Sequence, residues 1–159
     1  MNRWVSLLVF CLLPGLAWAG PVFDRVQAPV EASFAARAQG GDLLLDEVLD
    51  AEAAVDRQAA EGDDLTRVKY LLSHWRQSTR DYLLETAPAS EASFRAVVSQ
   101  LNKLGALLDE RALRALEHLS RVYPGAVDRV QVDGLILVHG DPKVAGRFLR
   151  PGSRLAPFL

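Results

Sequence analysis

The residues best suited to chemistry lie in one stretch, VQVDGLILVHGDPK, which spans residues 130–143 and includes His139. Asp133-Gly134 separates two runs rich in aliphatic residues, which is the strongest short-range signal for a β-hairpin with a two-residue turn. In that hairpin Asp128 lies directly across from His139 and on the same side, because side chains of a strand alternate with a period of two. The pattern therefore predicts an Asp128–His139 pair.

A carboxylate that orients an imidazole is half of a Ser-His-Asp triad, or part of a metal site. The sequence lacks the other half, because it contains no Gly-x-Ser-x-Gly motif and Ser153 follows a Pro-Gly turn without sign of activation. His74 and His118 lack metal-ligand spacing. We interpret Asp128 and His139 as a polar cap on the hairpin, and expect no catalytic residue, metal or cofactor. A small hydrolase or metal-assisted enzyme centred on this pair is the alternative.

A second candidate surface is the basic segment near the C-terminus, where residues 142–159 carry four basic side chains and no acidic one. Its mixture of charged and apolar residues suits an acidic protein partner or an anionic envelope surface. The alternative is that it faces the acidic segment 42–64 within the fold. Nucleic-acid binding is disfavoured by the net charge of −2. The predicted binding residues are Lys143, Arg147, Phe148 and Arg150.

The first 19 residues have the pattern of a secretory signal peptide. Residues 5–19 contain no charged side chain, and the Ala-Trp-Ala sequence at 17–19 is a small-x-small cleavage motif before Gly20. A retained membrane anchor fits less well, because 15 residues interrupted by Pro14 fall short of the ~20 that a spanning helix needs. We therefore expect cleavage between residues 19 and 20.

Cleavage would leave a chain without cysteine, because the only cysteine, Cys11, lies in the leader. This excludes disulfides, zinc–thiolate sites and thiol nucleophiles from the processed chain. A cysteine-free exported domain is ordinary in the bacterial periplasm. Removal of 19 of the 159 residues leaves 140, enough for one domain, and changes the net charge from −2 to −3 because only Arg3 is charged. We expect a periplasmic protein without a transmembrane segment after cleavage.

The elements that must position these residues are predicted to be helical up to residue 123. After an extended start, a short helix spans 30–39 and a second spans 42–60, with a Gly-Gly stop between them. A third begins at residue 64 and ends before Pro88. The apolar face of 91–123 keeps its phase across Gly105, which predicts one continuous helix. Two helices joined at this glycine are the alternative.

The predicted fold is α+β. Residues 20–123 form an antiparallel bundle of three main helices with a short leading helix, and residues 124–159 form a small antiparallel β unit packed on it. The β unit contains the hairpin and a final strand at 154–159. We expect an exported, non-catalytic accessory or binding protein that contacts a protein of the cell envelope through a helical face or the basic tail. A structural protein associated with the envelope surface is a further alternative.

Overall fold

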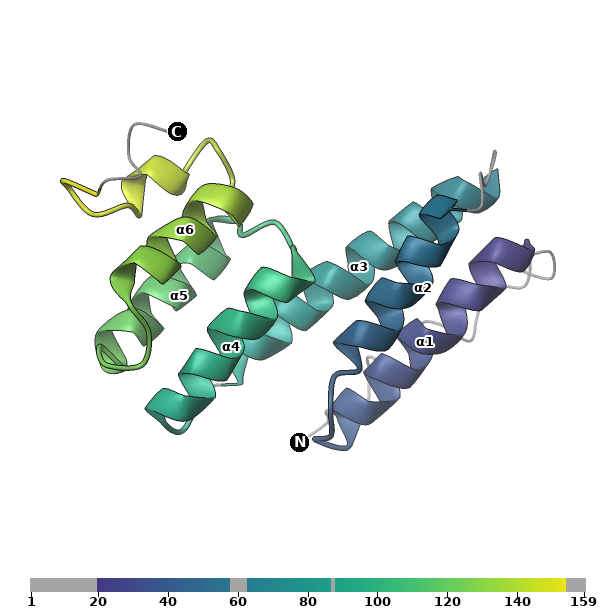
Figure 1. Ribbon diagram of the computed structural model, residues 1–159, viewed down its shortest axis with the longest axis horizontal. Coiled ribbons are helices and arrows are strands. Elements are labelled where there is room, and N and C mark those ends of the chain that lie inside the picture. The colour runs from purple at the N-terminus through teal and green to yellow at the C-terminus, as the bar shows by residue number, and fades with distance from the viewer. Residues whose placement is uncertain (1–19, 58–62, 87, 154–159) are drawn as a thin grey trace, which may run out of the picture. The chain divides into compact units, whose positions relative to one another are not determined.

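The computed structural model describes residues 20–57, 63–86 and 88–153, which form six α-helices and one short 3-10 helix (Figure 1). The chain divides into two compact units, residues 1–70 (unit 1) and 71–159 (unit 2), and the third helix contributes to both. The elements are α1 (Pro21–Ala38), α2 (Leu45–Arg57), α3 (Asp63–Glu85), α4 (Glu91–Leu104), α5 (Glu110–Val122), α6 (Arg129–His139) and η1 (Ala145–Arg147). None of the helices in this described part is long and apolar enough to cross a membrane.

The predicted C-terminal β unit is wrong, and with it the α+β fold class. The described residues contain no β-strand, and the segment predicted as a hairpin is the helix α6. The pairing that comes nearest to a strand there is an isolated bridge between Leu108 and Gly140. The predicted last strand, 154–159, and the predicted signal peptide, 1–19, lie outside the described residues.

The start of α6 explains why this segment is helical despite its turn signal. The Asp128 carboxylate accepts a hydrogen bond from the backbone N–H of Val130 at 3.1 Å, and the Gln131 side chain accepts one from the backbone N–H of Asp128 at 3.2 Å. The Gln131 bond is part of a capping box, in which the N-cap and N3 residues satisfy donors that the first helical turn leaves free. Asp128 therefore starts a helix, where the hairpin prediction placed it in a strand.

Helical spacing then places the apolar residues of α6 against the core. Val132, Leu135 and Ile136 are buried on one arc, and Asp133 is buried beside them. Arg129 donates to the Asp133 carboxylate at 2.9 Å from one turn earlier. The aspartate that suggested a tight turn is thus a paired side chain in the helix interior. Gly134 follows it in the middle of α6.

The predicted continuous helix over 91–123 is also wrong, and the alternative break at Gly105 is correct. α4 ends at Leu104, and Gly105 adopts the left-handed conformation with φ of 62°. This geometry is typical of a glycine that follows a helix C-terminus, because it carries no Cβ to clash there. The apolar pattern of residues 91–123 continues across the break, and the connecting residues Ala106 and Leu108 are buried as well.

Unit 1 is built around α1 and α2, which lie side by side (Figure 1). Its buried side chains include Val26 and Val30 of α1 and Val48 and Val55 of α2. The turn between the helices is fixed by Ser33, whose hydroxyl donates to the Leu43 carbonyl at 2.6 Å. The first helix is longer than predicted, since it starts at residue 21 and continues through a proline at 29.

Unit 2 holds the larger apolar core. Trp75 of α3 is 0% exposed, and Phe94 and Leu101 of α4 are fully buried with it. Leu113 and Leu116 of α5 complete the buried set from the neighbouring helix, and α4 packs against α6. The predicted helix that starts at 64 and ends before Pro88 corresponds to α3, which supplies this tryptophan.

Candidate functional site

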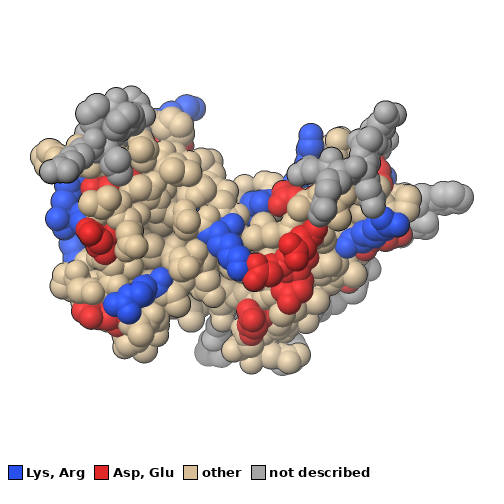
Figure 2. All heavy atoms as spheres, in the orientation of Figure 1, with Lys and Arg blue, Asp and Glu red and all other residues tan. Residues whose placement is uncertain are grey.

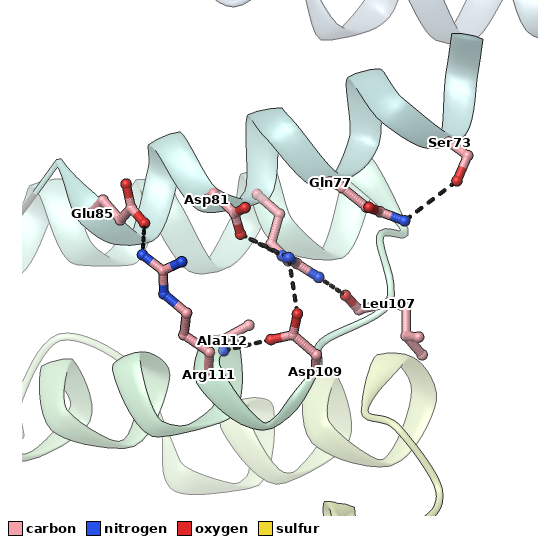
Figure 3. Close-up of polar contacts among 9 residues, drawn as sticks. Ser73, Gln77, Asp81, Glu85, Leu107, Asp109, Arg111 and Ala112 are labelled. Carbon is pink, nitrogen blue, oxygen red and sulfur yellow. Dashed lines mark hydrogen bonds and ion pairs between the residues drawn. The ribbon is translucent and has the colours of Figure 1, made fainter. Parts of the chain in front are cut away.

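Two arginines of α3 hold the connection between α4 and α5. Figure 3 shows the contacts that Leu107 and Asp109 of this connection make. Arg80 is only 6% exposed, and its guanidinium donates to the Leu107 carbonyl at 2.5 Å. The same guanidinium lies 2.7 Å from the Asp81 carboxylate and 3.1 Å from the Asp109 carboxylate. One turn earlier, Arg76 donates to the Leu104 carbonyl at the end of α4 at 2.9 Å. The connection 105–109 is therefore fixed to α3 at both of its ends.

Asp109 has two roles in this arrangement. One carboxylate oxygen pairs with Arg80, and the other accepts a hydrogen bond from the backbone N–H of Ala112 at 2.9 Å. The second bond makes Asp109 the N-cap of α5. This cluster was not predicted, because Arg80 and Asp109 are far apart in the sequence. The local signal for Asp109 was an aspartate before a helix, which is visible only once the break at Gly105 is known.

The same connection fixes the C-terminal end of α6. The backbone N–H of Leu108 donates to the His139 carbonyl at 2.7 Å, and the N–H of Asp141 donates to the Leu108 carbonyl at 2.9 Å. Gly140 follows the helix so tightly that an added Cβ would lie 2.4 Å from the Ile136 carbonyl oxygen. The end of α6 is thus held against α3 through the 105–109 connection.

His139 and Asp128 do not form the predicted pair. Asp128 caps the start of α6 and His139 is its last residue, so a rise of about 1.5 Å per residue separates them by roughly 16 Å. His139 instead lies beside Gly105, where a Cβ added to the glycine would be 3.9 Å from the imidazole Cε1. Burial lowers the pKa of His139 below its ordinary value of 6.5. Burial therefore favours the neutral form of this imidazole over the charged one.

The predicted basic surface keeps three of its four residues at or near the surface. Lys143 and Arg150 are exposed, and Arg147 lies 3.7 Å from the Glu110 carboxylate. A hydrogen bond from Arg114 and the charge of Arg147 lower the pKa of Glu110. Arg147 is therefore partly neutralised by a helix of its own unit.

Phe148, the fourth predicted binding residue, is buried in unit 2. Its carbonyl accepts a hydrogen bond from the Arg129 guanidinium at 3.0 Å. Since Arg129 also holds Asp133, one arginine joins the interior of α6 to the segment that follows η1. Phe148 therefore packs as a core residue of unit 2.

The side of α6 that faces away from the core is apolar too. At 100° per helical residue, Val130, Gly134, Leu137 and Val138 fall within an arc of about 100° that lies opposite the buried residues. Val130 is 64% exposed and Val138 is 69% exposed, while Leu137 is partly exposed. Figure 2 shows a largely uncharged surface over α6, whereas acidic side chains gather over α2. We call these residues the outer stripe of α6: Val130, Gly134, Leu137 and Val138.

Gly134 lies at the centre of the outer stripe and opens onto free space. A Cβ added to this glycine would meet no atom within 4 Å. Packing within the chain therefore does not require a glycine here, although glycine in a helix interior costs about 1 kcal/mol relative to alanine. The apolar residues of this segment are evident in the sequence, but the hairpin prediction could not identify their exposed face.

A shallow pocket of about 260 Å³ lies elsewhere in unit 2, between the end of α3 and the start of α4. Its lining is apolar apart from a few hydroxyl groups, and it carries no ionisable carboxylate, amine or imidazole. Such a lining offers a small apolar side chain a place to bind. The lining residues are Tyr82, Leu83, Thr86, Pro88, Ala89, Ser93 and Val97.

Comparison of this chain with protein-family models, with curated proteins and with solved structures found no match. Within the described ranges, no group of three or more histidine, cysteine, aspartate or glutamate side chains is arranged to hold a metal ion.

Proposed function

We propose that this chain is an exported, non-catalytic binding protein, and that the outer stripe of α6 is the surface that contacts its protein partner. The single observation that carries the proposal is that α6 is apolar on two opposite sides, of which one is exposed at Val130 and Val138. A surface helix normally has one apolar face toward the core and polar residues on the opposite side, so a second, exposed apolar side is an exception. The leader sequence and its small-x-small motif support the export that the proposal includes.

The shape of the stripe favours a helix as the partner's contribution. Gly134 forms a flat centre with valines four residues before and after it, so the backbone of a second helix could approach closely there. Ridges of one helix pack into such grooves of another at interaxial distances of 8–10 Å. We therefore expect the partner to supply an apolar helix face without charge at the crossing point.

The supporting cluster behind α6 suits this role. Binding surfaces lose less conformational entropy when their elements are already fixed. The C-terminal end of α6 is held by the bridge to Leu108, and its interior is held by the Arg129–Asp133 pair. The stripe would thus be presented in one conformation before the partner arrives.

The test replaces Gly134 with leucine. This change adds a bulky side chain to open space, so the fold should be retained while close approach of a partner helix is blocked. We expect a protein that co-purifies with the chain from its native cell envelope to be lost with Gly134→Leu. It should also cross-link to a photoreactive residue placed at Val138.

The matched control is Tyr70→Asp, which alters an exposed aromatic residue that is outside the stripe. It should retain the partner. Retention of the same partner by Gly134→Leu would refute the assignment to α6. Loss of binding only when Lys143, Arg147 and Arg150 are neutralised would place the surface on the basic segment. Cross-linking of Val138 to a second copy of the chain would identify self-association in place of a separate partner.

A further inference from the structure

The carboxylate of Asp64 lies directly against the backbone of Gly20 in unit 1. Gly20 precedes α1 as its N-cap, and Asp64 lies in the first turn of α3. A Cβ added to Gly20 would be 2.4 Å from Cγ and Oδ2 of Asp64 and 2.7 Å from Oδ1. A Cβ at position 20 would therefore displace the Asp64 carboxylate from this place. The starts of α1 and α3 accordingly lie at the same end of unit 1 (Figure 1).

One oxygen of this carboxylate is buried without a partner. Asp64 Oδ1 accepts no hydrogen bond from any of the described residues and is closed off from solvent. Buried polar atoms in folded proteins are nearly always paired, and an unpaired carboxylate oxygen is among the most costly exceptions. The structure thus contains an acceptor that lacks a donor, next to the residue at which the leader is expected to end.

Removal of the leader would create that donor. Hydrolysis of the bond between Ala19 and Gly20 consumes one water molecule, leaves a carboxylate on Ala19 and turns the amide nitrogen of Gly20 into an ammonium group. The single N–H of the amide is replaced by three donors and a positive charge. No other new charge appears in the part of the chain that remains.

We propose that the new ammonium group of Gly20 forms an ion pair with Asp64, and that this pair fixes the start of α1 to the start of α3 only after the leader is removed. The proposal rests on the export included in the proposed function. It assigns a purpose to the glycine at position 20 and to the unpaired Asp64 oxygen together. Removal of the leader during export would then also complete the contact between the starts of α1 and α3 in unit 1.

Helix electrostatics strengthen the requirement for a carboxylate at this place. A positive charge at the first residue of α1 is repelled by the helix dipole, whose positive end is the N-terminus. The Asp64 carboxylate offsets this repulsion, because it lies beside the same end of α1. An ammonium group paired in this way should hold its proton more tightly than a free chain terminus, whose pKa is about 7.7–8.0.

The test uses the chain released from a fusion so that Gly20 is the first residue, with its amino group either free or acetylated. Acetylation restores an uncharged amide, as in the unprocessed chain. We expect the pKa of the free Gly20 amino group, measured by NMR titration, to be raised by about one unit, equivalent to a tenfold preference for the charged form. Acetylation should accelerate hydrogen exchange of the α1 amides by about the same factor.

Asp64→Asn supplies the decisive comparison, because it keeps the shape of the side chain and removes its charge. In this variant the Gly20 pKa should return to its ordinary range, and acetylation should no longer change exchange in α1. Asp24→Asn, which removes a charge in the first turn of α1, is the matched control and should leave both effects intact.

An ordinary Gly20 pKa in the unmodified chain would overturn the proposal, and this measurement does not depend on whether Asp64→Asn folds. Equal effects of acetylation with and without Asp64 would overturn it as well. N-terminal sequencing of the chain from the cell envelope tests export separately. A retained leader there would refute the export part of the proposed function, while the ion pair measured in the released chain would stand.

Discussion

Two charged side chains are buried in the described part of the chain, Arg80 and Asp133, and each is paired in a way that fixes a connection. Arg80 is shared between two carboxylates and a carbonyl, so its charge and its donors are satisfied together. Asp133 is held by Arg129, which also binds the Phe148 carbonyl. Buried charges of this kind add little net stability as pairs, but removing one member leaves the other uncompensated.

The two roles of Asp109, as N-cap of α5 and as partner of Arg80, can be separated by substitution. Asp109→Ala removes both the cap of α5 and a carboxylate beside Arg80, and should lower the free energy of unfolding by about 2 kcal/mol. Asp109→Asn keeps an oxygen that can cap α5, so it should cost about 1 kcal/mol. Urea denaturation measures both values. Glu117→Gln, which breaks an exposed pair with Arg121, is the control and should cost less than about 0.5 kcal/mol. Equal losses for the two Asp109 variants would contradict a separate capping role.

His139 should make stability depend on pH. Burial lowers its pKa in the folded chain below the ordinary 6.5, so the unfolded chain binds its proton more readily. The buried imidazole therefore carries no penalty above pH 6.5, and stability falls as the pH drops below that value. Thermal unfolding of His139→Gln should show a weaker loss between pH 6.5 and the lowered pKa than the unchanged chain. Identical pH profiles for the two proteins would show that the imidazole is solvated in solution.

These residues also show how much of the site could be predicted from the sequence. His139, Lys143 and Arg150 stand out as polar groups near the C-terminus, but their surroundings depend on contacts made by distant residues. The Arg80–Asp109 pair joins positions 29 residues apart through a backbone break that local periodicity did not reveal. Pairing of this sort follows from tertiary packing, which a single sequence does not encode in any local spacing.

At the scale of elements, α6 contained two competing signals. Asp133-Gly134 favours a tight turn, and Asp128 with Gln131 favours a helix start. The helix prevails because the capping bonds form and because Val132, Leu135 and Ile136 reach the core together at helical spacing. The prediction weighted aliphatic and β-branched composition too strongly, since β-propensity depends on context. By contrast, the extent of α3 was predictable from a periodic apolar face and the proline that follows it.

The two helix-associated glycines should respond in opposite directions to alanine. Gly105 has φ of 62°, a conformation that costs other residues about 1–2 kcal/mol, so Gly105→Ala should destabilise the protein by that amount. Gly134 is in the interior of α6 with open space around it, so Gly134→Ala should stabilise the protein by about 0.5–1 kcal/mol. Denaturant unfolding of both variants measures the two changes. Destabilisation by Gly134→Ala would mean that this glycine is covered within the chain itself.

At the scale of the whole molecule, helical character and the acidic segment 42–64 were evident from the sequence, whereas the division into two units was not anticipated. The division falls within α3 after Tyr70, so a single helix supplies side chains to both units. Sequence periodicity describes one helix without indicating which parts of its length pack with which neighbours. Because the buried tryptophan of α3 belongs to unit 2, its fluorescence can be used to follow the folding of this unit.

Trp75 should report the folding of unit 2. Of the three tryptophans, Trp4 and Trp18 lie within residues 1–19, so a chain that begins at Gly20 contains Trp75 alone. Because this indole is 0% exposed, its fluorescence should be blue-shifted and resistant to quenching by iodide or acrylamide. Urea should shift the emission to that of a water-exposed indole in one cooperative transition.

Variants that loosen the same core provide the comparison for this signal. Leu116→Ala removes a fully buried side chain of α5 and should move the Trp75 transition to lower urea, with a loss of about 2–5 kcal/mol. Val48→Ala removes a fully buried valine of α2 in unit 1 and should perturb α1 and α2, as followed by hydrogen exchange. A smaller effect of Val48→Ala on Trp75 than on the α1 amides would indicate that the units unfold separately. Coincident transitions in both variants would show that α3 couples them, and a water-exposed Trp75 spectrum in the native chain would refute the packing of unit 2.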